Sequence, residues 1–478
     1  MTKVKEFSYH EIDFLLPIHR FKIQFSYVSK KGFPFIREFI LRLVHLDSMS
    51  PEQVGKYFGL SARETKEAIS DLVDRGDLSY TEEGNVKLTS QSSEYFTDLG
   101  DLPAVSTLFE RKSTLGFELA NFNCVGSKRT QEKWKNALVI DVSDEQKSKS
   151  ENLVKKHFQT QFYSILEKGF LGKLEVDDDP DSKTSPTIYK IDLAEKIGQE
   201  PYRLSQIMTI DEFGNQLGRS DIEQLEETSE IIDLITKTIS EKQKASNIRD
   251  VLSVMEKIGD KETQTLFRNR KIDVISLAQM ALVNENNKSG FYPFLGAIYS
   301  KNNWDLFLKY FNEIIAPMQK SHQDGIDDLI WIAPSDSFWG KTSRLAQCFE
   351  ELISASTVSG KNNKTLYKPK MYVPLSDKFD RNSKNQWKNE FSDYGRYLHG
   401  LVEGFMAGNV EVIVLPNKFV AVCYHISMPE QYDVTLPLGF IATDSEMVSK
   451  ITKLVQNYIG DVQGFDKPND LGLIRGGS

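Results

Sequence analysis

The sequence contains little cysteine, and its three cysteines are dispersed as Cys124, Cys348 and Cys423. No two of them have the CxxC spacing, so the sequence predicts neither a disulfide framework nor a cysteine-based zinc ribbon. Unpaired, scattered cysteines are typical of a reducing compartment, and we therefore expect a cytoplasmic protein.

Long apolar runs and an excess of positive charge are missing as well. No run approaches the ~18 apolar residues that a membrane span needs. Residues 14–16 are too short for the core of a signal peptide, and we expect no membrane partner. The net charge of −9 argues against a protein that coats nucleic acid with its whole surface, although a local basic patch can still bind DNA.

One segment has the spacing of a phosphate-binding loop but lacks its chemistry. In Ser335–Thr342 a serine replaces the first glycine of that motif, and two bulky aromatic rings stand where backbone N–H groups must wrap a phosphate. We therefore expect no nucleotide hydrolysis. Lys341 and Thr342 either hold a backbone phosphate of nucleic acid or belong to an ordinary helix start with Lys341 in solvent.

Metal-binding patterns are incomplete too. Residues 177–181 carry alternating aspartates as in a calcium loop, but the turn glycine and the bidentate glutamate of that motif are absent. This favours a solvated acidic turn. The acidic-x-Lys pattern of magnesium nucleases occurs at 145–147 and 181–183, but also inside a predicted helix at 64–66, so it recurs by chance. We predict no metal ligand, cofactor or catalytic residue.

The chain has 478 residues, 40% of them hydrophobic and 27% charged, which is typical of a soluble, multidomain protein. Between residues 35 and 96, the apolar spacing predicts three helices followed by a two-stranded hairpin. Ser50 and Ser61 are predicted N-caps of the second and third helices. Glu64 completes a capping box with Ser61, and Gly76 ends the third helix.

This segment resembles a winged helix-turn-helix domain of the kind found in MarR-like bacterial regulators. The matching residues are the turn Ser50–Ser61, the helix exit Leu72–Leu78, and Leu88–Thr89 leading into Glu94–Phe96. The resemblance implies that the third helix, with Arg63 and Lys66 exposed, contacts DNA. The same face also carries three acidic side chains, so protein docking is an equal alternative.

The whole sequence predicts a multidomain α/β fold. We assign 1–99 to the winged helix with an N-terminal arm, 100–220 to a small mixed α/β domain, 221–319 to a helical region, and 320–478 to a C-terminal α/β sheet domain. In the second part we expect one helix over residues 144–170 and two separate strands at 187–191 and 206–210. In the last part, strands alternate with helices, which implies a sheet covered by helices.

The end of the chain resembles, in its order of elements, the tail of phospholipase-D-like domains, with Leu436–Val448 as the matching run. Active members of that family need His-x-Lys-x4-Asp. None of the seven histidines here has lysine two places on, and after His425 that place is Ser427. The resemblance therefore implies a degenerate sensor domain without the family's chemistry, and we interpret His425 as a packing histidine.

A strongly basic segment runs from Gly360 to Lys388. Its cations and carboxylates sum to +6 in a chain of net −9, and aromatic rings are interleaved with them. Such a segment suits contact with a nucleic-acid backbone; an acidic protein partner and a solvated loop are the alternatives. The predicted contacts are Lys361, Lys364, Lys368, Lys370, Arg381, Lys384 and Trp387.

Together these patterns predict a non-catalytic, DNA-binding sensor or adaptor subunit of a multi-protein bacterial system. Chromosome maintenance or antiviral defence is suggested by analogy with other large winged-helix proteins. The expected partners are DNA and the protein subunits of a larger assembly. Two alternatives stay open: a metal-dependent nuclease whose acidic residues are scattered along the sequence, and a scaffold whose winged helix only docks proteins.

Overall fold

The fold is seen in a computed structural model, which describes residues 5–28, 35–96, 108–174, 186–244, 248–268, 270–320, 327–358, 364–460 and 469–474. The chain is mixed α/β, as the sequence predicts. It forms two compact units, of which the first comprises residues 1–17, 130–142 and 201–478, and the second 18–129 and 143–200. Both units are therefore discontinuous in sequence.

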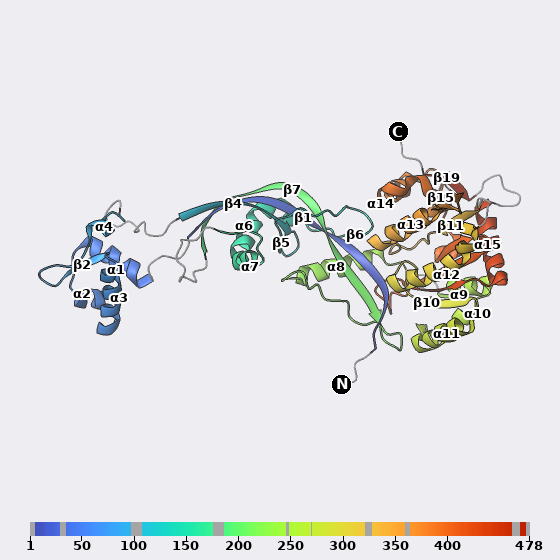
Figure 1. The fold of residues 1–478 in the computed structure, drawn as a ribbon, viewed down its shortest axis with the longest axis horizontal. Coiled ribbons are helices and arrows are strands. Elements are labelled where there is room, and N and C mark those ends of the chain that lie inside the picture. The colour runs from blue at the N-terminus through green and yellow to red at the C-terminus, as the bar shows by residue number, and fades with distance from the viewer. Residues whose placement is uncertain are drawn as a thin grey trace. The chain divides into compact units, whose positions relative to one another are not determined.

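Residues 35–96, in the second unit, form three helices and a hairpin at the places where the sequence predicts them (Figure 1). The elements are α1 (Phe35–Leu46), α2 (Pro51–Phe58), α3 (Ala62–Asp74), β2 (Leu78–Tyr80), β3 (Val86–Leu88) and the short α4 (Ser90–Ser93). Ser50 and Ser61 begin α2 and α3 with capping boxes. Gly55 lets the two helices approach closely, because a Cβ atom there would lie 2.7 Å from Thr65 Oγ1.

The rest of the second unit pairs β1 (Phe7–Val28) with β4 (Leu108–Glu118), and β4 with β5 (Cys124–Gly126). The single helix expected over residues 144–170 is wrong. It is divided into α5 (Asp144–Ser148), α6 (Ser150–Thr160) and α7 (Phe162–Glu167). At the first break the buried Ser150 hydroxyl donates to the carbonyl of Lys147 and lies 3.1 Å from His19 Nδ1; such side-chain bonds compete with the helical ladder.

Two long strands run through both units. β1 begins in the first unit, where it pairs in parallel with β6 (Leu138–Val139), and ends in the second. β7 (Thr187–Ile210) is one continuous strand where two separate ones were expected, and it pairs with β1. These strands are difficult to predict from the sequence because they contain buried polar residues, whose partners lie far away in the chain. Arg20, for example, is buried beside Glu200 at 3.1 Å.

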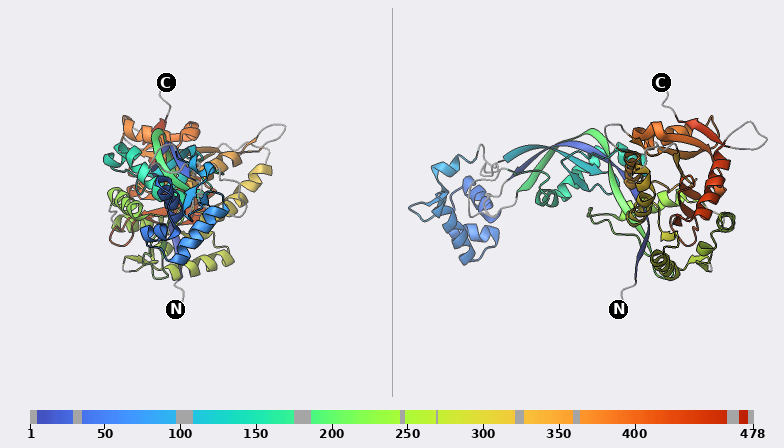
Figure 2. Two further views of the ribbon diagram at one scale, coloured as in Figure 1. Left: turned by 90° about the vertical axis from the view of Figure 1, so that its left-hand side faces the viewer. Right: turned by 45° about the vertical axis from the view of Figure 1, so that its right-hand side comes forward.

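The first unit is built on an eight-stranded sheet of order β10-β18-β17-β16-β11-β14-β15-β19. The C-terminal strands and helices of this unit are drawn in orange and red in Figures 1 and 2. Its strands are β10 (Phe291–Leu295), β11 (Asp328–Ile332), β14 (Lys368–Leu375), β15 (Leu398–Val402), β16 (Val410–Leu415), β17 (Phe419–Ile426), β18 (Leu436–Ala442) and β19 (Asp470–Leu473). β11, β14 and β15 are parallel neighbours, and the other pairs are antiparallel.

Helices cover both faces of this sheet. A large hydrophobic core lies between one face and the helices α12 (Lys301–Lys320) and α13 (Ser343–Ala355), and includes Trp304, Phe307, Trp331 and Phe349. On the other face, α9 (Ile248–Ile258) and α15 (Ser445–Gly460) contact β17. The further elements are α8 (Ser229–Lys242), α10 (Lys261–Gln264), α11 (Val274–Asn287), α14 (Arg381–Glu390), η1 (Ser392–Tyr397), η2 (Phe405–Gly408), β12 (Thr357–Val358) and β13 (Lys364–Thr365).

The prediction that residues 221–319 form a helical region is wrong in two places. β8 (Phe267–Arg268) and β9 (Lys271–Ile272) form a small hairpin, and β10 belongs to the large sheet. Pro293 is compatible with β10 because this is an edge strand, where a missing N–H is tolerated. Within the described ranges, none of the helices combines the length and the apolar character that a bilayer crossing requires.

Candidate functional site: a buried histidine between two carboxylates

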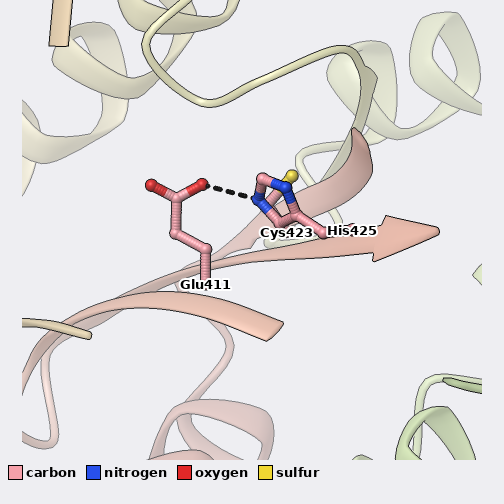
Figure 3. Close-up of side chains that lie close together, drawn as sticks. All are labelled: Glu411, Cys423 and His425. Atoms are coloured by element: carbon pink, nitrogen blue, oxygen red, sulfur yellow. Dashed lines mark hydrogen bonds and ion pairs between the residues drawn. The ribbon is translucent and has the colours of Figure 1, made fainter. Parts of the chain in front are cut away.

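Three chemically active side chains meet on one face of the large sheet. Glu411 of β16 and Cys423 of β17 are direct partners in the antiparallel register. His425 lies two residues further along β17, and therefore on the same face. Figure 3 shows the imidazole turned toward the carboxylate of Glu411, with the thiol of Cys423 beside it.

Both ring nitrogens of His425 have a carboxylate partner. Nδ1 lies 3.0 Å from Oδ2 of Asp336, and Nε2 lies 3.1 Å from Oε2 of Glu411. The second oxygen of Glu411, Oε1, accepts a hydrogen bond of 2.8 Å from the indole Nε1 of Trp331. The packing histidine expected from the sequence is thus buried, but its ring nitrogens contact two carboxylates, from two separate segments.

Asp336 reaches the site from the loop that follows β11. Its Oδ1 accepts hydrogen bonds from the hydroxyl of Thr435 at 2.7 Å and from the backbone N–H of Phe338 at 3.1 Å. The neighbouring Ser335 N–H donates to the carbonyl of Gly408 at 2.7 Å. These bonds fix the loop, so the carboxylate is held in place before anything binds.

Burial makes the electrostatics of this site strong. Glu411 and Cys423 are fully buried, and His425 is 1% exposed. Burial would lower the pKa of His425, but Cys423 and the hydrogen bonds to Asp336 and Glu411 outweigh burial and raise that pKa well above 6.5. Burial likewise opposes ionisation of Asp336, yet the bond to His425 keeps its pKa below the usual value. Burial raises the pKa of Cys423 to about 11.

A polar cavity of about 400 Å³ adjoins the histidine. Its walls include Asp336, His425 and, from another side, the exposed Lys242 and Lys244. The further polar lining comes from Asp250, Ser335, Ser337, Asn409, Ser427 and Thr435. A cavity with carboxylates, an imidazole and lysines suits a small polar or ionic ligand better than an apolar one.

The structure corrects the expectations for Lys341 and Thr342. Lys341 is 8% exposed, and its ammonium pairs with Glu390 at 2.8 Å instead of lying in solvent. Thr342 is 1% exposed and caps α13 by accepting from the N–H of Arg344. Neither side chain is presented to a nucleic-acid phosphate, because both are already used inside the fold.

The basic segment is divided among several elements. Lys361 lies outside the described residues. The ammonium of Lys364 in β13 donates to the carbonyl of Met318, and Lys370 in β14 pairs with Asp328 at 2.6 Å. Lys368 on β14 and Arg381 on α14 are exposed. Two of the seven predicted contacts of this segment thus already serve the fold.

Two further members of that segment also have internal partners. Lys384 donates to the carbonyl of Lys378 at 2.5 Å. Trp387 donates from its indole N–H to the carbonyl of Pro374 at 3.1 Å, and its ring packs against Trp339 with centroids 6.0 Å apart. The tryptophan is therefore part of the core contacts of α14 and is not displayed for stacking on bases.

The other sequence-derived candidates have different outcomes. Arg63 and Lys66 are both exposed on α3. In the acidic-x-Lys pattern at 145–147, Glu145 forms an exposed i,i+4 pair with Lys149 at 2.7 Å, which is an ordinary helix-surface contact. The aspartates expected to form an acidic turn, at 177–181, lie outside the described residues.

Sequence reasoning missed Glu411, Cys423 and Asp336 as a group. A usable signal was present for the first two. Residues 416–418 separate two strand-like runs, and pairing Leu415 with Phe419 across that turn places Glu411 opposite Cys423. No comparable signal points to Asp336, which is separated from Glu411 in the chain by two α-helices, α13 and α14, and four strands, β12 to β15.

Comparison of the chain with protein-family models, with curated protein sequences and with solved structures found no match. The resemblances to winged-helix and phospholipase-D-like domains therefore stay predictions from the sequence. The interpretation of the sites below is based on their own geometry and chemistry.

Proposed function

We propose that the chain binds duplex DNA through residues 35–96, with α3 as the helix that enters the major groove, and that it acts without catalysis as an adaptor. The order of elements supports this proposal. α2 and α3 are joined by the short turn at Gly59–Ser61, and the hairpin β2–β3 follows. Helix-turn-helix proteins use the N-terminal residues of their second helix to contact base edges.

The charge arrangement on α3 is the observation that carries the proposal. In the sequence, the exposed face of this helix has two basic and three acidic residues. In the structure, Glu64 is bound in the capping box, where it accepts from the N–H of Ser61 at 2.9 Å. Asp71 forms ion pairs with Arg37 and with Arg75, the latter at 3.1 Å. Two of the three acidic groups are thus engaged locally.

The exposed charges that remain at the N-terminal end of α3 are a basic pair and one acidic side chain, Glu67. Arg63 and Lys66 are exposed, three residues apart, and lie on neighbouring positions of the helix surface. Lys87, on β3 of the hairpin, is exposed as well. Arginine and lysine are the side chains that most often contact guanine in the major groove, and lysine also suits the phosphate backbone.

Anisotropy titration of the full chain with duplex DNA at several salt concentrations tests this function. Arg63→Ala with Lys66→Ala should weaken binding by about 1–3 kcal/mol and reduce the slope against log salt. The matched control removes two exposed lysines elsewhere, Lys237→Ala with Lys309→Ala, and should bind as the wild type does. Equal affinity of all three proteins would contradict the proposal.

Protein docking is the second candidate, and one observation favours it. A largely apolar pocket of about 570 Å³ lies between α2, α3 and the hairpin, with Gly55, Leu60, Ile69 and Tyr80 in its lining. Such a pocket fits an apolar segment of a partner subunit. Absence of DNA binding, together with crosslinks from α3 to a protein, would decide for docking.

The broader expectation is that the chain serves a multi-protein bacterial system of chromosome maintenance or antiviral defence. This part of the proposal rests on analogy. The nuclease alternative is tested separately, by incubating the protein with plasmid DNA and magnesium or manganese. Nicking that depends on the added ion would replace the adaptor function by an enzymatic one.

A further inference from the structure

We propose that Glu411, Cys423 and His425 bind one Zn²⁺ ion, through Oε2, Sγ and Nε2. Their candidate ligand atoms all lie within 4.8 Å of one another. Zinc–ligand distances of about 2.0–2.3 Å place the ligands of a tetrahedral site roughly 3.3–3.8 Å apart. The observed separation of 3.1 Å between Nε2 and Oε2 needs only a small widening to admit the ion. This inference is independent of DNA binding.

The backbone presents these ligands in a rigid arrangement. Glu411 and Cys423 face each other across β16 and β17, and His425 follows on the same face of β17 (Figure 3). Side chains that stand opposite in an antiparallel pair have Cβ atoms about 4.5–5.5 Å apart. β16 and β17 are interior strands of the sheet, so their positions do not depend on a loop that must close.

The surrounding hydrogen bonds orient the imidazole and the carboxylate, while the thiol of Cys423 donates to the carbonyl of Gly296 at 3.8 Å. Asp336 accepts at Nδ1 of His425, which turns Nε2 toward Glu411. Trp331 donates to Oε1 of Glu411, which leaves Oε2 for the ion. Histidines that ligate zinc commonly donate their other ring N–H to a carboxylate, and this contact fixes both tautomer and ring orientation.

The charge balance of the site is compatible with a bound divalent ion. Among the described residues, the ion pairs of Asp336 and Glu411 are with His425 alone. Two carboxylates and one imidazolium give the metal-free site a net negative charge, with Glu411 and His425 enclosed in the fold. Lys242 and Lys244 line the neighbouring cavity but form no ion pair with either carboxylate. Zinc would replace one proton on Sγ and one on Nε2, so it adds no unpaired charge to the buried site.

The donor set selects the metal. A thiolate and an imidazole favour zinc over magnesium or calcium, which prefer oxygen ligands. Binding breaks the Sγ–H bond of Cys423 and the Nε2–H bond of His425, and both protons leave to solvent as the ion enters. The net charge of the site is unchanged by this exchange, since two protons are replaced by one divalent ion.

Titration of metal-free, full-length protein with Co²⁺ tests the site, because cobalt occupies zinc sites and has a visible spectrum. We expect one cobalt ion per chain, a near-ultraviolet thiolate-to-cobalt band, and loss of that band on adding Zn²⁺. Cys423→Ser should abolish the band and weaken binding at least about tenfold. Cys348→Ser is the matched control, since Cys348 is equally buried but lies on α13 outside the cluster.

A second variant keeps the test decisive if the serine protein folds poorly. Glu411→Gln retains the shape of the side chain, and should lower zinc affinity at least about tenfold while the cobalt–thiolate band persists. Circular dichroism confirms that each variant is folded. The proposal is overturned if the wild type takes up no cobalt, or if Cys423→Ser and Glu411→Gln both bind it as the wild type does.

Discussion

Glu411 and Cys423 stand directly opposite each other on β16 and β17, and the antiparallel pairing continues from Val410↔Tyr424 to Leu415↔Phe419. The candidate site is therefore built mainly by strand register. Asp336 alone comes from a loop, and that loop is fixed by bonds to Thr435 and Gly408. Interior strands of a sheet move little when a ligand binds. The positions of these side chains can therefore be used to predict how substitutions change stability.

The charge balance of the network predicts a large effect on stability. In metal-free protein, His425→Leu leaves two buried carboxylates without their cation and should cost about 3–5 kcal/mol in the free energy of unfolding. Asp336→Asn keeps its shape and should cost less, about 1–3 kcal/mol. Urea denaturation measures both. The control Glu285→Gln removes an exposed partner of Lys309 and should change stability by ~0.5 kcal/mol or less.

The same network predicts a pH dependence with a defined sign. The pKa of His425 in the folded protein is raised well above the 6.5 of an unperturbed histidine. The stabilisation that protonated His425 gives to the folded protein is complete below pH 6.5. It is lost as the pH rises through the pKa of His425 in the folded protein, because the unfolded chain releases the proton first. With a chelator present, the free energy of unfolding of the wild type should fall as the pH rises above 6.5. The measurement ends at pH 9.0, the pKa of an unperturbed cysteine thiol, so that titration of cysteines does not contribute.

The control for this pH dependence is His425→Gln, which removes the titrating group. Its stability should be lower throughout and nearly flat over the same range. Asp336 does not confound the measurement, since its lowered pKa affects stability only below about 3.8. Parallel slopes in the variant and the wild type would show that another group is responsible.

Local signals in the sequence predicted the elements of residues 35–96 well. The caps at Ser50 and Ser61 and the spacing of apolar residues depend on near neighbours, and the structure has helices and a hairpin at those places. The long strands were not predictable in the same way. In β1, buried Asp13 contacts Arg203 at 2.9 Å, a partner about 190 residues away, so the apolar pattern is interrupted where the strand continues.

The candidate site was predictable only in part. The turn between Leu415 and Phe419 fixes which residues face each other, so Glu411 and Cys423 follow from a local pattern. Asp336 does not, because the parallel and antiparallel neighbours of β11 are set by the whole sheet. Burial of Lys341 was missed for a similar reason, since its partner Glu390 lies 49 residues further along the chain.

The Lys341–Glu390 ion pair predicts that substitution of Lys341 lowers the stability of the protein, which is not evident from the sequence. Both side chains are largely buried, at 10% and 14% exposure. Lys341→Ala leaves the carboxylate of Glu390 without its cation and should reduce the free energy of unfolding by about 2–4 kcal/mol, slightly less than for a fully buried pair. Thermal and urea unfolding measure this change. Lys309→Ala, which removes an exposed partner of Glu285, is the control and should differ little from wild type.

The absence of a side chain at Gly439 lets β18 lie very close to β17 beside the candidate site. It pairs with Cys423 in the register of β17 and β18, and a Cβ atom there would lie 1.9 Å from the carbonyl oxygen of Val422. Gly439→Ala must therefore move β17 or β18, which should cost about 1–3 kcal/mol and alter the cobalt–thiolate spectrum. Gly198→Ala on β7 places its Cβ in open space and should change stability by no more than ~1 kcal/mol. Equal stability and identical spectra for the two variants would show that strand approach at Cys423 is not constrained.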